Sequence, residues 1–164
     1  MQPLALLAAL TALYLSGQPA MAQSTHSIER RNKALVRSSF DAWRAGTGSP
    51  YELLADAVTW TIVGHSAASR TYPSKEAFLS EVISPFNARM SVGLKPAIRN
   101  IFAEGQTVIV FFDAQGIARD GKAYANTYAW FLDLRDDRIV SASAFFDSIA
   151  FNDFWQRVQP KAQE

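Results

Sequence analysis

Asp113 is the residue of this sequence that could most directly do chemistry. It follows the apolar run Val108-Ile109-Val110-Phe111-Phe112, where a carboxylate is unusual. A carboxylate among apolar side chains must accept hydrogen bonds or have a raised pKa, because an unpaired buried charge is costly. Such a group can act as a general acid or base at a cavity wall. The alternative is a structural Asp–Tyr hydrogen bond, or a strand end that reaches water.

The nearest candidate partner of Asp113 is Tyr128, and a predicted hairpin brings the two together. Asp120-Gly121 is the strongest hairpin signal in the chain, and a two-residue loop there places Asp113 opposite Tyr128. A second two-residue turn, at Asp136-Asp137, adds the next strand beside Tyr128. One face of the sheet then combines polar and aromatic side chains suited to a pocket wall: Asp113, Gln115, Asn126, Tyr128, Trp130, Ser143 and Phe145. A β-bulge would exchange the faces beyond it, because side-chain direction alternates along a strand.

Other residues have both a functional and a plainer interpretation. Trp60 can shape an apolar ligand site at a cavity mouth, although core packing is its simpler role. Asn126 could bind a ligand or only complete cross-strand hydrogen bonds. His65, in a polar loop, is a candidate ligand-contacting residue or a solvated loop residue. Asp147 stands where the last helix needs an N-cap, which is its expected role.

The composition excludes several classes of protein. With no cysteine, the chain has no disulfide, thiolate nucleophile or Cys-ligated zinc, and its two histidines argue against a His-rich metal site. Sixteen Lys and Arg nearly balance fifteen Asp and Glu, which argues against nucleic acid as a partner. No phosphate-cradling Gly loop or dinucleotide fingerprint occurs. The sequence therefore predicts no metal and no cofactor.

The first 22 residues are typical of a signal peptide. Leu4 to Leu15 form an apolar run of 12 residues, too short to cross a hydrocarbon core about 30 Å thick as a helix. Ala20-Met21-Ala22 then supplies the small-x-small pattern of a cleavage site. Cleavage after Ala22 would leave residues 23–164 as a single periplasmic or secreted domain without a membrane anchor. An amphipathic or buried first helix is the alternative, but the run is apolar on all sides.

Hydrophobic periodicity predicts helices before and after a group of strands. Helical spacing covers 29–45; Ser49 begins a capping box, Ser74 can cap another helix, and Pro85 should interrupt that helix. Strands are predicted at 58–62, 94–103, 106–118, 123–134 and 139–146, and a closing helix at 151–158. This order is α+β: N-terminal helices packed on a curved antiparallel sheet, with a C-terminal helix, in a cone-shaped fold. The cone would enclose a pocket for a small apolar molecule, and its open sheet face predicts a homodimer.

Several short segments together carry a family likeness: Phe40-Asp41-Ala42-Trp43, the run from Leu54 to Thr61, Tyr72 before Ser74, Tyr124 to Trp130, and Phe145-Phe146-Asp147. On these segments the chain resembles the SnoaL-like branch of the nuclear transport factor 2-like (ketosteroid isomerase-like) superfamily, from about Asn32 to Val158. The resemblance implies the cone-shaped fold, which hosts both enzymes and binding proteins. It also implies that Ala144 and Phe146 line the pocket beside Asp113, which requires a bulge between them.

The catalytic residues of that superfamily transfer poorly to this chain. Ketosteroid isomerases carry a general-base Asp where this chain has Thr61. The position of their oxyanion-binding Tyr falls near Ser39 or Phe40 of this chain, and neither of these is a Tyr. Of the Asp–Arg–Asp set of limonene epoxide hydrolases, only one member is matched, by Asp113.

The sequence therefore predicts an exported SnoaL-like protein with an apolar pocket. One hypothesis is an isomerase-, hydrolase- or cyclase-type enzyme acting on a small hydrophobic molecule by general acid–base chemistry, in which Asp113 moves the proton and Tyr128 or Asn126 polarises an oxygen. The alternative is a non-catalytic protein that binds a small apolar ligand, and a third option is an interaction module that uses the exposed sheet face. The residues predicted to contact the ligand are Trp60, Asn126, Trp130, Ala144, Phe146 and His65.

Overall fold

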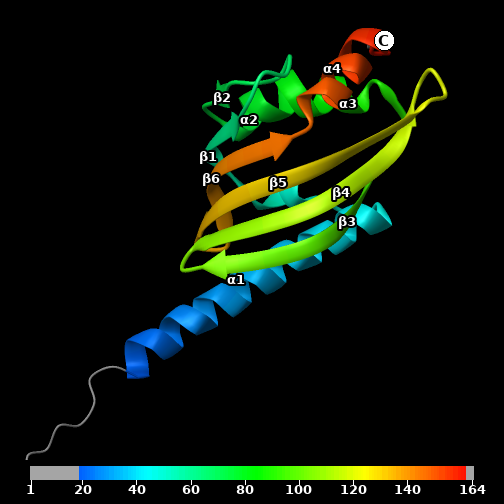
Figure 1. Ribbon diagram of the computed structural model, residues 1–164. Helices are drawn as coiled ribbons and strands as arrows, with labels where there is room; N and C mark the ends of the chain where they lie inside the picture. Colours follow the sequence, from blue (N-terminus) through cyan, green and yellow to red (C-terminus); the bar gives the residue numbers. More distant parts are fainter. Residues whose placement is uncertain (1–18, 162–164) are drawn as a thin grey trace, which may run out of the picture.

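A long helix, a six-stranded sheet and a closing helix dominate the computed structural model, which describes residues 19–161 (Figure 1). The helical elements are α1 (Pro19–Ala45), the 3-10 turn η1 (Pro50–Leu53), α2 (Lys75–Phe78), the π-helical turn η2 (Leu79–Ile83), α3 (Ser84–Asn87) and α4 (Ser148–Arg157). The strands are β1 (Leu54–Ile62), β2 (Thr71–Tyr72), β3 (Met90–Glu104), β4 (Thr107–Ala118), β5 (Ala123–Arg135) and β6 (Arg138–Phe146). This order confirms the predicted α+β class.

Local capping signals begin the short helices, as predicted. The Ser49 side chain accepts the Tyr51 N–H, and the Glu52 carboxylate accepts the Ser49 N–H at 3.0 Å, which completes the capping box. Ser74 accepts the Ala77 N–H at 3.1 Å and so begins α2.

The helical segment from α2 to α3 changes its hydrogen-bond pattern in the middle. It widens into the π-turn η2 and restarts as α3 at Ser84, with Pro85 in the first turn, where its missing N–H is tolerated. Asp147 caps α4, because its Oδ1 accepts the Ile149 N–H at 2.9 Å. Helix α1 begins at Pro19, ten residues before the predicted helix.

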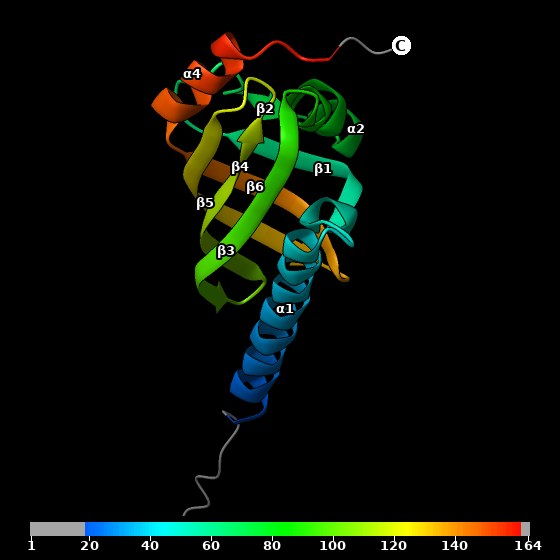
Figure 2. The same ribbon diagram turned by 90° about the vertical axis from the view of Figure 1, so that its right-hand side faces the viewer.

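The sheet is mixed rather than antiparallel throughout. Its strand order is β2-β1-β6-β5-β4-β3, and each neighbouring pair is antiparallel except β1 and β6. The predicted meander holds for β3 to β6. Register shifts interrupt β3 at several points and β6 near its start, and such bulges bend strands. The bending gives the sheet the deep concave side visible in Figure 2.

The loop of the β4–β5 hairpin is one residue longer than predicted. The Ala118 N–H donates to the Lys122 carbonyl at 2.8 Å, which leaves residues 119–121 as a three-residue loop. Gly121 supplies the left-handed conformation that such a loop needs, with φ of 83°.

The longer loop makes the predicted strand pairing wrong. Asp113 pairs with Thr127 instead of Tyr128, so Asp113 and Tyr128 point to opposite sides of the sheet. The second turn forms at Asp136-Asp137 as predicted, with both residues at positive φ. A bulge in β6 then pairs Tyr128 with Phe146. The residues wrongly placed beside Tyr128 are Asp113, Gln115, Ser143 and Phe145.

The helices lie on the concave side of the sheet (Figures 1 and 2). Helix α1 crosses β3 and β4, and its Phe40 ring packs edge-on to Phe112 at 4.8 Å between centroids. At the other end, the segment from α2 to α3 meets α4, with Phe86 and Phe154 rings 4.9 Å apart. The buried core lies between these helices and the sheet.

The predicted signal peptide lies almost entirely outside the described residues. Only its last residues, from Pro19, are described, as the first turn of α1. Within 19–161, no helix has both the length and the apolar character needed to cross a bilayer.

Candidate functional site

A cavity of about 740 Å³ opens on the concave side, between the α2–α3 segment and the sheet. Its walls come from the end of α1, from η1, from the α2–α3 segment and from all the long strands except β4. The lining is largely apolar, and its main apolar members are Trp43, Tyr51, Trp60, Ile62, Phe78, Leu79, Val82, Ile83, Phe86, Met90, Leu94, Tyr128, Trp130, Ala144, Phe146 and Phe151. The volume is in the range typical of small-molecule sites.

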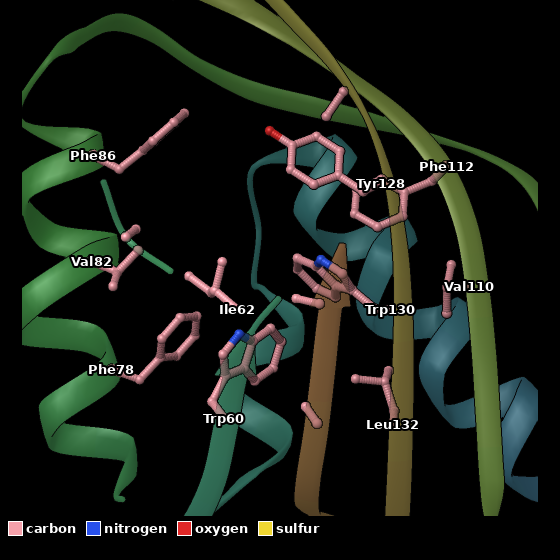
Figure 3. Close-up of a cluster of buried hydrophobic side chains, with 14 of the residues drawn as sticks. Trp60, Ile62, Phe78, Val82, Phe86, Val110, Phe112, Tyr128, Trp130 and Leu132 are labelled. Atoms are coloured by element: carbon pink, nitrogen blue, oxygen red, sulfur yellow. The ribbon is translucent and has the colours of Figure 1, made fainter. Parts of the chain in front are cut away.

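Aromatic rings form the floor of this cavity. The Trp60 ring stacks on Phe78 at 4.4 Å and meets Trp130 edge-on at 5.1 Å. Tyr51 lies 6.0 Å from Trp130, and Trp43 stacks on Trp130 at the same separation. Figure 3 shows the rings from β1, from β5 and from the α2–α3 segment pointing toward one another. Fixed rings of this kind favour a flat apolar guest.

The Tyr128 hydroxyl is held by a hydrogen-bond chain that runs through Tyr124 to Asn126. The Asn126 amide donates to the Tyr124 oxygen at 3.0 Å, and the Tyr124 oxygen lies 3.2 Å from that of Tyr128. The Tyr124 oxygen has two lone pairs, so while it accepts the Asn126 amide it can either accept from the Tyr128 hydroxyl or donate to it. In Figure 3 the Tyr128 hydroxyl points away from β5 toward the α2–α3 segment, where a guest could exchange a hydrogen bond with it.

The Asn126 amide itself is fixed by backbone groups. It donates to the Asp147 carbonyl at 2.9 Å and accepts the Asp147 N–H at 3.0 Å. Burial raises the pKa of Tyr128 well above its ordinary value, so the phenol stays neutral near pH 7. Tyr128 is therefore a neutral hydrogen-bonding group in the cavity wall.

The Trp60 indole is a second donor without a partner. The side chain is 1% exposed, and among the described residues no acceptor reaches its Nε1. A buried N–H without an acceptor costs about 1–3 kcal/mol. A guest that placed an acceptor there would recover part of that cost.

Most of the predicted ligand-contacting residues line this cavity. Trp60, Trp130, Ala144 and Phe146 do so together with Tyr128. Asn126 is buried behind the wall, where it completes cross-strand hydrogen bonds, the plainer of its two predicted roles. His65 is exposed in the loop after β1 and does not line the cavity.

Asp113 lies on the convex side, away from the cavity. Its Oδ2 accepts the Arg99 Nε–H at 2.6 Å, and its Oδ1 accepts the Thr127 hydroxyl at 2.7 Å. These hydrogen bonds, Thr127 first, hold the pKa of the Asp113 carboxyl below its usual range. The side chain is 41% exposed. The prediction that Asp113 faces Tyr128 in a pocket wall is therefore wrong, and an ionised, doubly hydrogen-bonded carboxylate is a weak base.

Several wall residues had no functional signal in the sequence. Tyr51 was part of a capping box, and Phe78 and Val82 belonged to an ordinary apolar helix stripe. Tyr124, which lies behind the wall and hydrogen-bonds to Tyr128, could have been found, because it shares the strand parity of Asn126 and Tyr128. Within residues 19–161 no group of three or more His, Cys, Asp and Glu side chains could hold a metal ion.

Comparison with known proteins gives a family and a fold. A family profile described as a SnoaL-like domain matches residues 28–142. No curated protein matches the chain in sequence. Many solved structures match in fold, and several are described as NTF2-like proteins.

Three of these structures illustrate the match. Bal32a, from a soil-derived mobile gene cassette, is 18% identical with a TM-score of 0.64, over 78% of this chain and 98% of that chain. A putative SnoaL-like polyketide cyclase from Jannaschia sp. CCS1 is 17% identical with a TM-score of 0.58, over 75% of this chain and 90% of its own. TerC, co-crystallized with polyporic acid, is 17% identical with a TM-score of 0.62, over 76% of this chain and 98% of its own.

Proposed function

The chain belongs to the SnoaL-like domain family, and on this premise we propose that it binds a small, flat, hydrophobic molecule in the concave cavity. The observation that carries the proposal is the buried Tyr128 hydroxyl, which hydrogen bonds through Tyr124 to Asn126 hold in the wall of an aromatic hollow. The guest would present a carbonyl or similar acceptor to Tyr128 and its apolar body to the rings around Trp130.

Burial makes such a hydrogen bond selective. A neutral phenol surrounded by apolar rings has little contact with water, so a guest with a polar atom near the Tyr128 hydroxyl would bind better than one without. The Trp60 Nε1 group favours the same kind of guest. Among the described lining residues, the one carboxylate is Glu52, and the Ser49 N–H already occupies its Oε1. The cavity therefore has two neutral donors and no free internal base.

A second function, electrophilic catalysis, is favoured by the same Tyr128 hydroxyl in the cavity wall. A preorganised donor that polarises a carbonyl can stabilise charge developing on oxygen during an isomerisation or a cyclisation. The relatives described as a polyketide cyclase and as a complex with polyporic acid support a guest of this kind. The proton acceptor would have to be water or the guest itself, because Asp113 is on the other face.

The binding proposal can be tested with prodan, a neutral dimethylaminonaphthyl ketone whose emission reports hydrogen bonding to its carbonyl. We expect prodan to bind, and Tyr128→Phe to weaken binding about two- to tenfold, as for loss of one hydrogen bond, with a further blue shift of emission. Asp113→Asn, on the convex side, is the matched control and should change neither quantity. Equal affinity and emission for the wild-type and Tyr128→Phe proteins would contradict the proposal.

The catalytic alternative requires the natural guest. Mass spectrometry of small molecules that copurify with the protein would identify it, and incubation with fresh guest would show whether a product forms. A product whose formation rate falls in Tyr128→Phe favours catalysis, whereas binding without any product favours the carrier role.

We also propose that the protein is exported and works in the periplasm or outside the cell. The proposal rests on the apolar run of Leu4 to Leu15 and the Ala20-Met21-Ala22 site. The intact mass of protein recovered from outside the cytoplasm should correspond to residues 23–164, and a mass that retains Met1 would contradict it.

A further inference from the structure

The mouth of the cavity carries more positive than negative charge. Four charged side chains line the cavity among the described residues: Arg44, Glu52, Lys75 and Lys95. The whole chain has a formal net charge of only +1, so the excess at this opening is local. Arg44 is exposed and Lys75 is half-buried, while the aromatic lining is mostly buried. Lys95 pairs with Gln115 on the face of the sheet that carries Asp113, and it also borders a hollow on that convex face. Arg44 and Lys75 are therefore the cations at the rim of the cavity.

The two rim cations come from separate elements and have no carboxylate partners. Arg44 lies in the last turn of α1 and Lys75 at the start of α2. Within 19–161 neither of them forms an ion pair. Other arginines of the protein do pair with carboxylates: Arg31, Arg70, Arg99 and Arg157.

The remaining rim charge is already engaged. The Glu52 Oε1 accepts the Ser49 N–H at 3.0 Å, as part of the capping box that begins η1. Glu52 is therefore held toward its own backbone and forms no ion pair with Arg44 or Lys75, so the charges at the rim still sum to a positive value. A low-dielectric hollow beside unpaired cations attracts negative charge, because field lines concentrate at such an opening.

We infer that the guest is an amphipathic anion, and this inference rests on the proposed binding function. Its flat apolar body fills the cavity, a polar atom reaches Tyr128, and an ionised acid group such as a carboxylate or sulfonate lies between Arg44 and Lys75. Donors at the floor and cations at the rim select for the same property: a guest that supplies acceptors at both ends.

A matched pair of fluorescent probes separates charge from shape. Anilinonaphthalenesulfonate (ANS) and N-phenylnaphthylamine (NPN) share an arylaminonaphthalene skeleton, but only ANS carries a sulfonate. We expect ANS to bind more tightly than NPN, and its advantage to shrink at about 0.5 M salt, where screening is stronger. Replacing each rim cation, by Arg44→Gln or Lys75→Gln, should weaken ANS about two- to fivefold and leave NPN unchanged.

Two controls accompany the rim variants. Arg37→Gln, on α1, and Lys122→Gln, in the β4–β5 loop, remove the same charge from positions that do not line the cavity, and they should leave ANS affinity unchanged. Ala144→Trp should fill the cavity and abolish binding of both probes, with folding checked by circular dichroism. Val82→Phe fills the opposite wall and replaces it where Ala144→Trp fails to fold.

The outcomes separate a failure of the anionic-guest inference from a failure of the proposed binding function. Equal affinity for ANS and NPN, with both blocked by the cavity-filling variant, would overturn the anionic guest and keep the binding site. The same follows if the control variants weaken ANS as much as the rim variants do. Failure of both probes to bind, or binding that the cavity-filling variants do not affect, would overturn the binding function itself.

Discussion

Asp113 and Tyr128 lie on neighbouring strands but face opposite sides of the sheet. Their surroundings keep Asp113 ionised and Tyr128 neutral. Hydrogen bonds from Thr127 and Arg99 hold the pKa of the Asp113 carboxyl low, so it is ionised near pH 7. Burial raises the pKa of Tyr128, so it remains a neutral phenol. A carboxylate satisfied by two donors is a poor base, whereas a neutral phenol can donate a hydrogen bond. The proposed function therefore rests on Tyr128 and not on Asp113.

The state of Asp113 leads to a pH-dependent stability prediction. Because its pKa in the folded protein is below the ordinary 3.8, the ionised carboxylate stabilises the fold above about pH 4, and this contribution is lost as pH falls through the lowered pKa. Asp113→Asn should therefore lower the Tm at pH 7, and the difference from wild type should shrink near pH 2.5. A Tm difference that stayed constant or grew on acidification would contradict the assignment. Thr127→Val, which removes one donor, should reduce the difference at pH 7.

At the scale of elements, Gly116 in β4 lets the irregular start of β3 approach closely. A Cβ atom at Gly116 would lie 2.6 Å from the Val92 carbonyl oxygen, a contact with backbone that cannot move aside cheaply. This approach shapes the bulged part of β3, whose residues Val92, Gly93 and Leu94 line the cavity. The irregularity is thus tied to the site.

Gly116→Ala should lower the free energy of unfolding by about 1–3 kcal/mol, because β3 must shift to admit the methyl group. Gly93→Ala is the matched control, since a Cβ there meets nothing within 4 Å, and it should cost much less. Urea denaturation of the two variants measures the difference. Equal destabilisation would contradict the close approach of β3 to Gly116.

Local signals allowed the helices and strands to be predicted from sequence. The strand register also depends on the number of residues in the β4–β5 loop, which no local signal supplies. Ser49, Ser74 and Asp147 act on backbone groups within three residues, so their capping roles could be predicted. The Asp120-Gly121 pair indicated a hairpin correctly, but the same pair suits loops of two or three residues. That single residue decides which face of β4 points inward.

The position of the bulge in β6 likewise could not be predicted from a local signal. It brings Ala144 and Phe146 onto the face of Trp130 and Tyr128, and the family resemblance indicated that a bulge was needed without showing its position. The part of the cavity wall that comes from β1, β5 and β6 was therefore predictable, whereas the part that comes from the α2–α3 segment was not. The chemistry of the cavity was not predictable either, because the face occupied by Asp113 depended on the hairpin loop.

On the scale of the whole molecule, the concave face holds the cavity and the convex face carries exposed aromatic side chains. Two cross-strand rows lie there, Phe102–Ile109–Phe131 and Phe111–Ala129–Phe145, joined by backbone pairing. Phe102, Phe131 and Phe145 are 55%, 39% and 42% exposed, and the Phe131 and Phe145 rings meet edge-on at 5.8 Å. Clustered exposed aromatics of this kind mark an interface. We propose that this convex patch forms the homodimer interface.

The dimer prediction follows from what charge does to such a patch. Phe131→Glu together with Phe145→Glu would place carboxylates where the partner's apolar surface must pack, and the cost of desolvating them should raise the dimer dissociation constant on the order of 100-fold or more. Sedimentation velocity should show wild-type dimers and monomers of the double variant.

Ile149→Glu is the control, because Ile149 is 81% exposed but lies on α4, outside the patch, and it should leave the dimer intact. Prodan affinity should survive in the monomer, since the cavity opens on the opposite side of the sheet. A wild-type protein that sediments as a monomer at micromolar concentration would reject the dimer and leave the patch as a surface for a different partner.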